Sequence, residues 1–214
     1  AKDQSYVLAS LTQHQLSKIM MPVGMYGKAE IRRMAEELNL GVAHKKESMD
    51  LCFIPDGDTA GFLKDRMKTL TPGPIKDVSG EILGEHDGLG AFTVGQRKGL
   101  GIATGKPRYV LELKVADNTL VVGGTGDLER VGMKVDELNW IDPTFAEGLP
   151  QGRQASIQYR STHRGAPGVL KGTPEAIEID VHFDEPQSAL SPGQAAVFYR
   201  DDEVVGGGTI ASSF

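Results

Sequence analysis

The spacing of apolar side chains divides the chain into a helical first part and a longer strand-rich part. Apolar residues recur at intervals of three and four positions over residues 28–40, which predicts an amphipathic helix, and a similar spacing over residues 5–20 predicts a second helix that ends before Pro22. Residues 51–54 are all apolar, as in a short buried strand, and residues 60–67 are expected to form a short helix. The first third of the chain is therefore predicted to be mainly helical.

After Thr71 the pattern changes to short apolar stretches between tight turns, which is typical of β-strands. One hairpin is expected to turn at Ser79 and Gly80, and another is expected to pair residues 109–115 with residues 119–123. A new unit is expected to begin between residues 130 and 136, with short strands at residues 154–159, 176–183, 195–199 and 204–210. Their regular spacing predicts a small closed or nearly closed antiparallel barrel, so the fold class is α+β.

The composition is that of an ordinary globular chain and narrows the range of chemistry. The chain has 214 residues, of which 27 are glycine and 11 are proline, and this suits many short strands joined by tight turns. A net charge of −6 does not favour nucleic-acid binding over the whole surface, although a local basic patch can outweigh the average. No apolar run approaches the roughly 20 residues that span a bilayer, and no secretory signal opens the sequence. These features predict a cytoplasmic protein that binds no membrane.

Cys52 is the only cysteine and offers the widest choice of chemistry. A thiol can attack an electrophile, carry sulfur or bind a metal, whereas a single cysteine excludes an internal disulfide and a zinc site built from several cysteines. A lone cysteine inside an apolar run is also typical of a small buried core residue. The residues alone leave both interpretations open, and they predict no metal site.

Two polar loops are candidates for contacts with phosphate. Arg97 and Lys98 lie between glycines, where backbone N–H groups can approach an anion closely, although neither a Walker A loop nor a dinucleotide fingerprint is present. Tyr159, Arg160 and His163 follow a predicted strand, where an aromatic ring can stack on a base and cations can hold phosphates. The alternatives are a tight turn with solvated charges and a polar loop.

Several segments, taken in their order along the chain, resemble one known family. They are Lys2–Tyr6, Lys45–Ile54, Gly84–Gly88, Thr93–Ile102, Phe183–Pro186 and Ser191–Tyr199. Together they closely resemble the tRNA-specific 2-thiouridylase family, and the segments around Cys52 and from Gly95 to Gly101 are the most specific to it.

The resemblance implies a sulfurtransferase that thiolates C2 of the wobble uridine of tRNA in an ATP-dependent reaction. The family's N-terminal domain is a PP-loop ATP pyrophosphatase with an SGGxDS-type loop, which uses ATP with Mg²⁺ to adenylate the base oxygen. A persulfide on the cysteine that matches Cys52 supplies the sulfur, which comes from a sulfur-donor protein. A second cysteine of the N-terminal domain closes a disulfide as sulfur departs or helps to release sulfide. A central domain and a C-terminal β-barrel hold the tRNA.

The sequence departs from this pattern because it contains neither an SGGxDS loop nor a second cysteine. The resemblance therefore implies the C-terminal portion of a thiouridylase, with the ATP site outside this chain and no activity in the chain alone. The expected domains are a helical tail of the catalytic domain over residues 1–54, a small mostly-β central domain over residues 55–132, and the tRNA-binding barrel over residues 133–214.

Site residues follow by matching position to the family. Cys52 is the expected catalytic residue, and the expected tRNA contacts are Lys2, Asp3, Gln4, Gln158, Tyr159, Arg160 and Gln194. Gln158 stands where the family more often has arginine, which weakens that contact. The alternative function is a non-catalytic RNA-binding β-barrel module in which Cys52 is inert, and a weaker one is a barrel that binds another protein.

Overall fold

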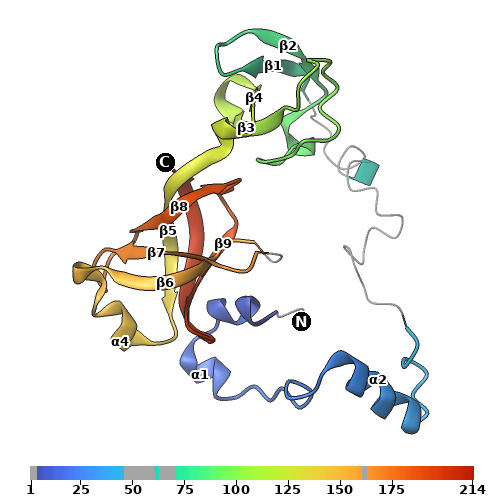
Figure 1. The fold of residues 1–214 in the computed structure, drawn as a ribbon, viewed down its shortest axis with the longest axis vertical. Coiled ribbons are helices and arrows are strands. Elements are labelled where there is room, and N and C mark those ends of the chain that lie inside the picture. Colours follow the sequence, from blue (N-terminus) through green and yellow to red (C-terminus); the bar gives the residue numbers. More distant parts are fainter. Residues whose placement is uncertain (1–3, 46–60, 63–70, 161–162) are drawn as a thin grey trace. The chain divides into compact units, whose positions relative to one another are not determined.

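The computed structural model describes residues 4–45, 61–62, 71–160 and 163–214. The chain divides into two compact units, one made of Ala1–Leu16 with Thr69–Phe214 and the other of Ser17–Lys68. The first unit holds a four-stranded sheet, drawn in green in Figure 1, and a six-stranded barrel, drawn in yellow to red. Among the described helices, none is long and apolar enough to cross a lipid bilayer.

The second unit contains the predicted amphipathic helix as α2 (Lys28–Glu37). An ion pair of 2.6 Å joins Arg33 Nη1 to Glu37 Oε1 one turn apart on its exposed face. The helix ends earlier than residue 40 because Asn39 adopts a left-handed conformation with φ of 52°, which asparagine tolerates better than most residues. The predicted strand at residues 51–54 lies outside the described residues.

The single helix predicted over residues 5–20 is wrong. The chain forms a 3-10 helix, η1 (Ser5–Ser10), and then a separate short helix, α1 (Gln13–Leu16). Asn139 of the barrel donates from Nδ2 to the carbonyl oxygens of Ala9 at 2.7 Å and Leu11 at 2.9 Å, so these carbonyls are not available to a continuous helix. Thr12 and Gln15 then cap the start of α1 reciprocally, with each side chain accepting from the other residue's backbone N–H.

The four-stranded sheet confirms both predicted hairpins and adds an unexpected pairing. Its strands, in the order β2-β1-β4-β3, are β1 (Gly73–Asp77), β2 (Ile82–His86), β3 (Tyr109–Lys114) and β4 (Thr119–Gly123). Gly80 has φ of 91° in the first turn, as a tight hairpin requires. The two hairpins join through a parallel pairing of β1 with β4, which alternation along the chain does not reveal. Three 3-10 turns complete this region, η2 (Leu89–Ala91), η3 (Val115–Asp117) and η4 (Gly126–Leu128).

The predicted C-terminal barrel is confirmed as a closed antiparallel barrel in the order β10-β5-β8-β7-β6-β9. Its strands are β5 (Glu129–Trp140), β6 (Arg153–Gln158), β7 (Ala166–Lys171), β8 (Ile179–Ser188), β9 (Ala195–Arg200) and β10 (Glu203–Ser213), and two short helical turns, α4 (Pro143–Ala146) and η5 (Leu149–Gln151), follow β5. Phe198 is the largest fully buried side chain of its core. Because β5 starts at Glu129, the proposed domain boundary at residues 132–133 falls within a strand, and the three-domain division stays a prediction.

Two features of the barrel differ from the sequence pattern. Strand β7 was not predicted because Pro167 and Gly168 weaken its β signal. In the structure, a Cβ at Gly168 would lie only 2.5 Å from the His182 carbonyl oxygen of β8, so glycine permits the close pairing of the two strands. Strand β8 extends beyond residue 183, where the predicted strand ended, and runs through Asp184, Glu185 and Pro186. Its pairing with β5 shifts register there, which accommodates a proline that has no N–H to donate.

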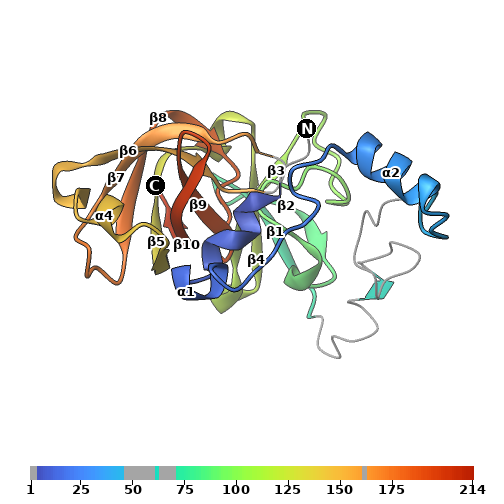
Figure 2. The ribbon, with the colours of Figure 1, turned by 90° about the horizontal axis from the view of Figure 1, so that it is seen from below.

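The glycines of β10 allow other parts of the backbone to approach this strand closely. A Cβ at Gly207 would lie 2.7 Å from the Ala196 carbonyl oxygen of β9 and 3.1 Å from the Ala9 Cβ of η1. Figure 2 shows the blue N-terminal helices beside β10. The N-terminal segment therefore packs directly on the barrel wall.

Candidate functional site

The expected site residues fall into two groups by what the structure describes. Cys52, Lys2 and Asp3 lie outside the described residues. Gln4 is exposed at the start of η1, and Gln158, Tyr159, Arg160 and Gln194 all lie in the barrel. These five described residues can be compared with one another in space.

The register of the barrel brings its four expected residues to one end. Strand β6 pairs antiparallel with β9, with Ser156 opposite Tyr199 and Gln158 opposite Val197. The chain beyond Gln158 therefore runs toward the start of β9, which Gln194 immediately precedes. We call the end formed by residues 158–160, 187–188 and 194 the barrel rim.

Arg160 is exposed on the barrel rim but held in place by its neighbours. Its Nη2 donates to the Ser188 carbonyl oxygen at 3.0 Å, and its guanidinium carbon lies 5.3 Å from the centroid of the Tyr159 ring. Gln158 donates from Nε2 to the Arg160 carbonyl oxygen at 3.1 Å. A guanidinium has five N–H donors in a fixed plane, so donors remain for a phosphate while the side chain stays oriented.

Tyr159 does not offer an open ring for base stacking, contrary to the expectation from the sequence. Its side chain is only 2% exposed, and its hydroxyl donates to Gln187 Oε1 at 2.9 Å. The centroid of the His163 ring lies 4.2 Å from the centroid of the Tyr159 ring. The centroid of the Phe183 ring lies 5.8 Å from it, in an edge-on arrangement. The alternation along β6 explains this, because Ile157 and Tyr159 point inward while Arg160 points outward. In this structure Tyr159 supports Arg160 and His163.

His163 belongs to the immediate surroundings of the barrel rim. The sequence pattern made it a candidate for phosphate contact, but it was not among the residues matched to the family. Its Nδ1 accepts from the Gly165 backbone N–H at 3.0 Å, which requires an unprotonated nitrogen. Burial, and then the nearby positive charge of Arg160, lower the pKa of His163 below its ordinary value of 6.5. The ring is therefore neutral at neutral pH.

We expect NMR titration to give His163 a pKa below 6.5, since burial and Arg160 both disfavour its protonation. Arg160→Gln should raise that pKa without restoring the ordinary value, because burial is the larger cause. As pH falls, the unfolded chain takes up the proton first, so the stability that neutral His163 contributes is complete above pH 6.5 and declines as pH falls from there to the folded pKa.

The matched control is Arg164→Gln, which removes an exposed neighbouring cation that does not contribute to the shift. It should leave the His163 pKa unchanged. A wild-type pKa at or above 6.5, or an equal rise in both variants, would contradict this account.

Gln194 ends a tight turn that the sequence pattern does not single out as functional. Its backbone N–H donates to the Ser191 carbonyl oxygen at 3.2 Å, and Gly193 has φ of 83°. The exposed side chain of Gln194 makes no hydrogen bond with another described residue. Only the family resemblance pointed to it.

Gln4 lies apart from the barrel rim. The next residue, Ser5, has its hydroxyl 3.2 Å from the Tyr199 hydroxyl, near the far end of β9. At the usual rise of a strand, about 16 Å separate Tyr199 from Gln194. The structure thus brings four of the expected residues together and leaves Gln4 on a different part of the barrel surface.

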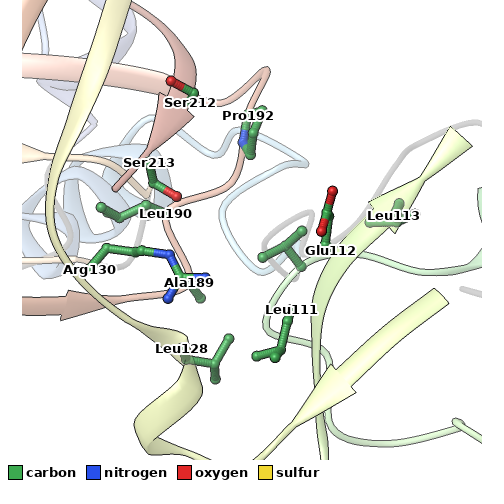
Figure 3. Close-up of a pocket in the computed structure, with 11 residues that line it drawn as sticks. Leu111, Glu112, Leu113, Leu128, Arg130, Ala189, Leu190, Pro192, Ser212 and Ser213 are labelled. Atoms are coloured by element: carbon green, nitrogen blue, oxygen red, sulfur yellow. The ribbon is translucent and has the colours of Figure 1, made fainter. Parts of the chain in front are cut away.

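A separate hollow of about 500 Å³ lies between β3 and the barrel (Figure 3). Most of its lining side chains are apolar, including Leu111, Leu128 and Leu190, and its titratable lining residues are Glu112 and Arg130. Among the described lining residues there is no cysteine or histidine, so Glu112 is the one side chain there that is suited to acid–base work. Among the residues that the structure describes, no cluster of histidine, cysteine and carboxylate side chains could hold a metal ion.

Comparison with known proteins matches consecutive parts of the chain to three family models. The tRNA methyl transferase HUP domain matches residues 1–56, the tRNA methyl transferase PRC-barrel domain matches residues 60–124, and the Aminomethyltransferase beta-barrel domain matches residues 130–210. The third match covers most of the observed barrel, and Cys52 lies within the first match.

Relatives with curated names match almost the entire chain. The tRNA-specific 2-thiouridylase MnmA of Solibacter usitatus is 44% identical over 217 residues, with 98% of this chain and 58% of the relative covered. The proteins of that name from Carboxydothermus hydrogenoformans and Syntrophotalea carbinolica are 41% and 47% identical, with 98% of this chain covered in both cases and 56% and 58% of the relatives. The chain thus spans a little more than half the length of these relatives, and it belongs to the MnmA family of tRNA-specific 2-thiouridylases.

Proposed function

We propose that this chain is the C-terminal portion of a tRNA 2-thiouridylase, which transfers sulfur to C2 of the wobble uridine of tRNA. The observation that carries the proposal is the identity of 41–47% to thiouridylases over 98% of the chain. The names of two matched family models refer to methyl transfer. We favour sulfur transfer because the full-length relatives carry that activity in their names and because Cys52 lies in a matched segment.

Cys52 is the residue that we propose to carry the sulfur, as a persulfide. The terminal sulfur of a persulfide is a better nucleophile at neutral pH than an ordinary thiol, so it can form the new bond to the activated C2 of uridine. As the sulfur bonds to C2, the oxygen that ATP has adenylated leaves as AMP. A second thiol must then attack the Cys52 sulfur, so that the S–S bond breaks, the outer sulfur stays on the base and a disulfide forms. Because Cys52 is the only cysteine of the sequence, that second thiol belongs to another part of the protein or to another molecule.

The HUP domain family implies that the full-length enzyme uses ATP. Within residues 4–45, the structure describes helices and turns but no strand, so this part offers no strand–loop–helix cradle for a nucleotide phosphate. We expect residues 1–214 alone neither to hydrolyse ATP nor to thiolate RNA, and we assign them the sulfur carrier and part of the tRNA surface.

The barrel rim is the part of that surface that the described residues support best. Arg160 is exposed, oriented and only partly hydrogen-bonded, and Gln194 presents a free amide at the same end. A local surface of this kind can bind RNA despite the net charge of −6, because close phosphate contacts depend on nearby cations and shape. Lys2, Asp3 and Gln4 complete the proposed tRNA contacts. We also propose a cytoplasmic protein that receives its sulfur from a donor protein.

The experiment that tests the proposal is sulfur loading of the full-length protein. Incubation with a cysteine desulfurase and cysteine should add one sulfur to the peptide that contains Cys52, and mass spectrometry of that peptide measures it. A thiol reductant should remove the added sulfur. A folded full-length protein that gains no sulfur at Cys52 under these conditions would contradict the proposal.

A further inference from the structure

A small basic pocket lies in the long loop between η2 and β3. Its volume is about 240 Å³, and its cationic lining residues are Arg97, Lys106 and Arg108. The remaining lining residues are neutral, and glycines are prominent among them. We call this the loop pocket.

The loop is anchored, so the pocket is part of the fold. Leu100 is buried in the core of the four-stranded sheet, and Ile102 packs against that core. The Gly95 backbone N–H donates to the Val110 carbonyl oxygen at 2.8 Å, and the Val110 N–H donates to the Gln96 carbonyl oxygen at 2.9 Å. The loop therefore leaves and rejoins the sheet at fixed points, and its cations start from a fixed backbone.

The backbone of the loop offers many unused donors. In the part of the chain that the structure describes, the backbone N–H groups of residues 97–106 donate to no other residue. Gly99, Gly101 and Gly105 have φ of 76°, 68° and 66°, in the left-handed region. Left-handed residues within a turn are the setting in which successive N–H groups form anion-binding concavities. A Cβ at Gly101 or Gly105 would meet nothing within 4 Å, so there is space for a side chain at both positions. Glycine is favoured there because the backbone φ angle is positive.

The cations of the loop lack close carboxylate partners in the part of the chain that the structure describes, although the charge of Arg108 acts on Asp77 at longer range. Among the described residues, Arg97, Lys98, Lys106 and Arg108 form no ion pair, whereas Lys134 and Arg200 of the barrel each contact two carboxylates. Arg108 Nε is moreover buried without a hydrogen-bond partner. A buried N–H without a partner is costly, so a hydrogen-bond acceptor that reached this atom would be stabilising.

The loop also contacts the segment that carries part of the barrel rim. A Cβ at Gly95 would lie 2.6 Å from the Ala189 Cβ, so the two backbones are closely packed. Ala189 follows Ser188, whose carbonyl oxygen accepts from Arg160. The loop pocket and Arg160 are therefore connected through one short segment, and a polyanion that lies on the rim can extend toward the pocket.

We propose that the loop pocket binds a backbone phosphate of the tRNA that the barrel rim holds. The arginine guanidinium planes suit the paired oxygens of a phosphate, and free N–H groups of the loop add neutral donors. This inference rests on the proposed function and names a further part of its RNA surface. Inorganic phosphate and pyrophosphate share the recognised chemistry, so the test separates them from RNA.

The test measures the dissociation constant of the full-length protein for a substrate tRNA as a function of salt concentration. The variant is Arg97→Gln with Lys106→Gln, which changes two exposed side chains and leaves the partly buried Arg108 in place. We expect weaker binding and a slope of log Kd against log salt that is smaller by about one for each phosphate that the variant no longer neutralises. The matched control is Lys114→Gln with Lys171→Gln, which removes two other exposed cations and should leave affinity and slope unchanged.

A second readout locates the bound phosphate on the RNA. Ethylation of individual tRNA phosphates should identify one or two positions that weaken binding to the wild type but not to the Arg97/Lys106 variant. Unchanged affinity and slope in that variant, beside tight binding by the wild type, would overturn the pocket and leave the proposed function intact. Loss of pyrophosphate binding without any effect on tRNA would overturn the RNA assignment. A wild type that neither binds tRNA nor gains sulfur would instead contradict the proposed function.

Discussion

Replacement of Cys52 by serine in the full-length protein is expected to abolish 2-thiolation of tRNA. Serine is close to cysteine in size, but its hydroxyl cannot form a persulfide, so no sulfur reaches the base. We expect the rate to fall by about a thousandfold or more, as it does when the reacting group of an enzyme is removed. Retardation of thiolated tRNA on a mercury-containing gel, together with nucleoside mass spectrometry, measures the product.

Binding of tRNA is the internal control for this variant. Its dissociation constant should stay within about twofold of the wild type, because the proposed tRNA contacts do not include Cys52. Thiolation that survives Cys52→Ala, together with slow alkylation of Cys52 in the native protein, would favour the alternative of a non-catalytic RNA-binding module. The matches to thiouridylases over 98% of the chain lead us to expect the opposite result.

Gly208→Ala is expected to cause a large loss of stability in the barrel. The added Cβ would lie 2.3 Å from the Asp136 carbonyl oxygen of β5 and 2.7 Å from the Val135 side chain. The carbonyl oxygen belongs to a paired strand, so it cannot move without disturbing the register of β5 against β10. Overpacking of this kind costs about 1–3 kcal/mol, and we expect a value at the upper end because backbone must shift.

Urea unfolding of residues 1–214 measures this effect, with fluorescence of Trp140 as the signal. Trp140 is the only tryptophan and stacks on Phe198 at 5.6 Å between ring centroids, so it reports on the barrel. Gly126→Ala is the matched control, since its Cβ would meet nothing within 4 Å and should change the unfolding free energy by much less. Equal destabilisation by the two substitutions would show that the close approach at Gly208 does not limit stability.

Local sequence was enough for the features that depend on neighbouring residues. The hairpin at Gly80 follows from a turn whose φ of 91° suits glycine, and α2 follows from helical spacing of apolar residues. The barrel was predictable because four of its strands, β6, β8, β9 and β10, alternate or are apolar over a short span between turns. Even the burial of Tyr159 follows from alternation along β6, although its polar neighbours suggested a stacking role.

Interactions between distant residues account for the features that the sequence did not reveal. The predicted helix at residues 5–20 is interrupted because the Asn139 side chain donates hydrogen bonds to the carbonyl oxygens of Ala9 and Leu11, which lie 130 and 128 positions away in the sequence. The parallel pairing of β1 with β4 and the addition of β7 depend on partner strands, which a local pattern does not specify. In these cases, contacts between distant parts of the chain outweigh the local preference of the sequence.

The sequence by itself determined the fold class, the family resemblance and the identity of the one thiol, because composition, periodicity and motif order are properties of the chain alone. Tertiary structure decided which polar residues lie in the same region. Arg160 and Gln194 lie at one end of the barrel because β6 and β9 are antiparallel, and Arg97 and Arg108 line one pocket because the loop between them is anchored at both ends by the sheet. These placements depend on strand register and loop closure, which are established only when distant parts of the chain pack against one another.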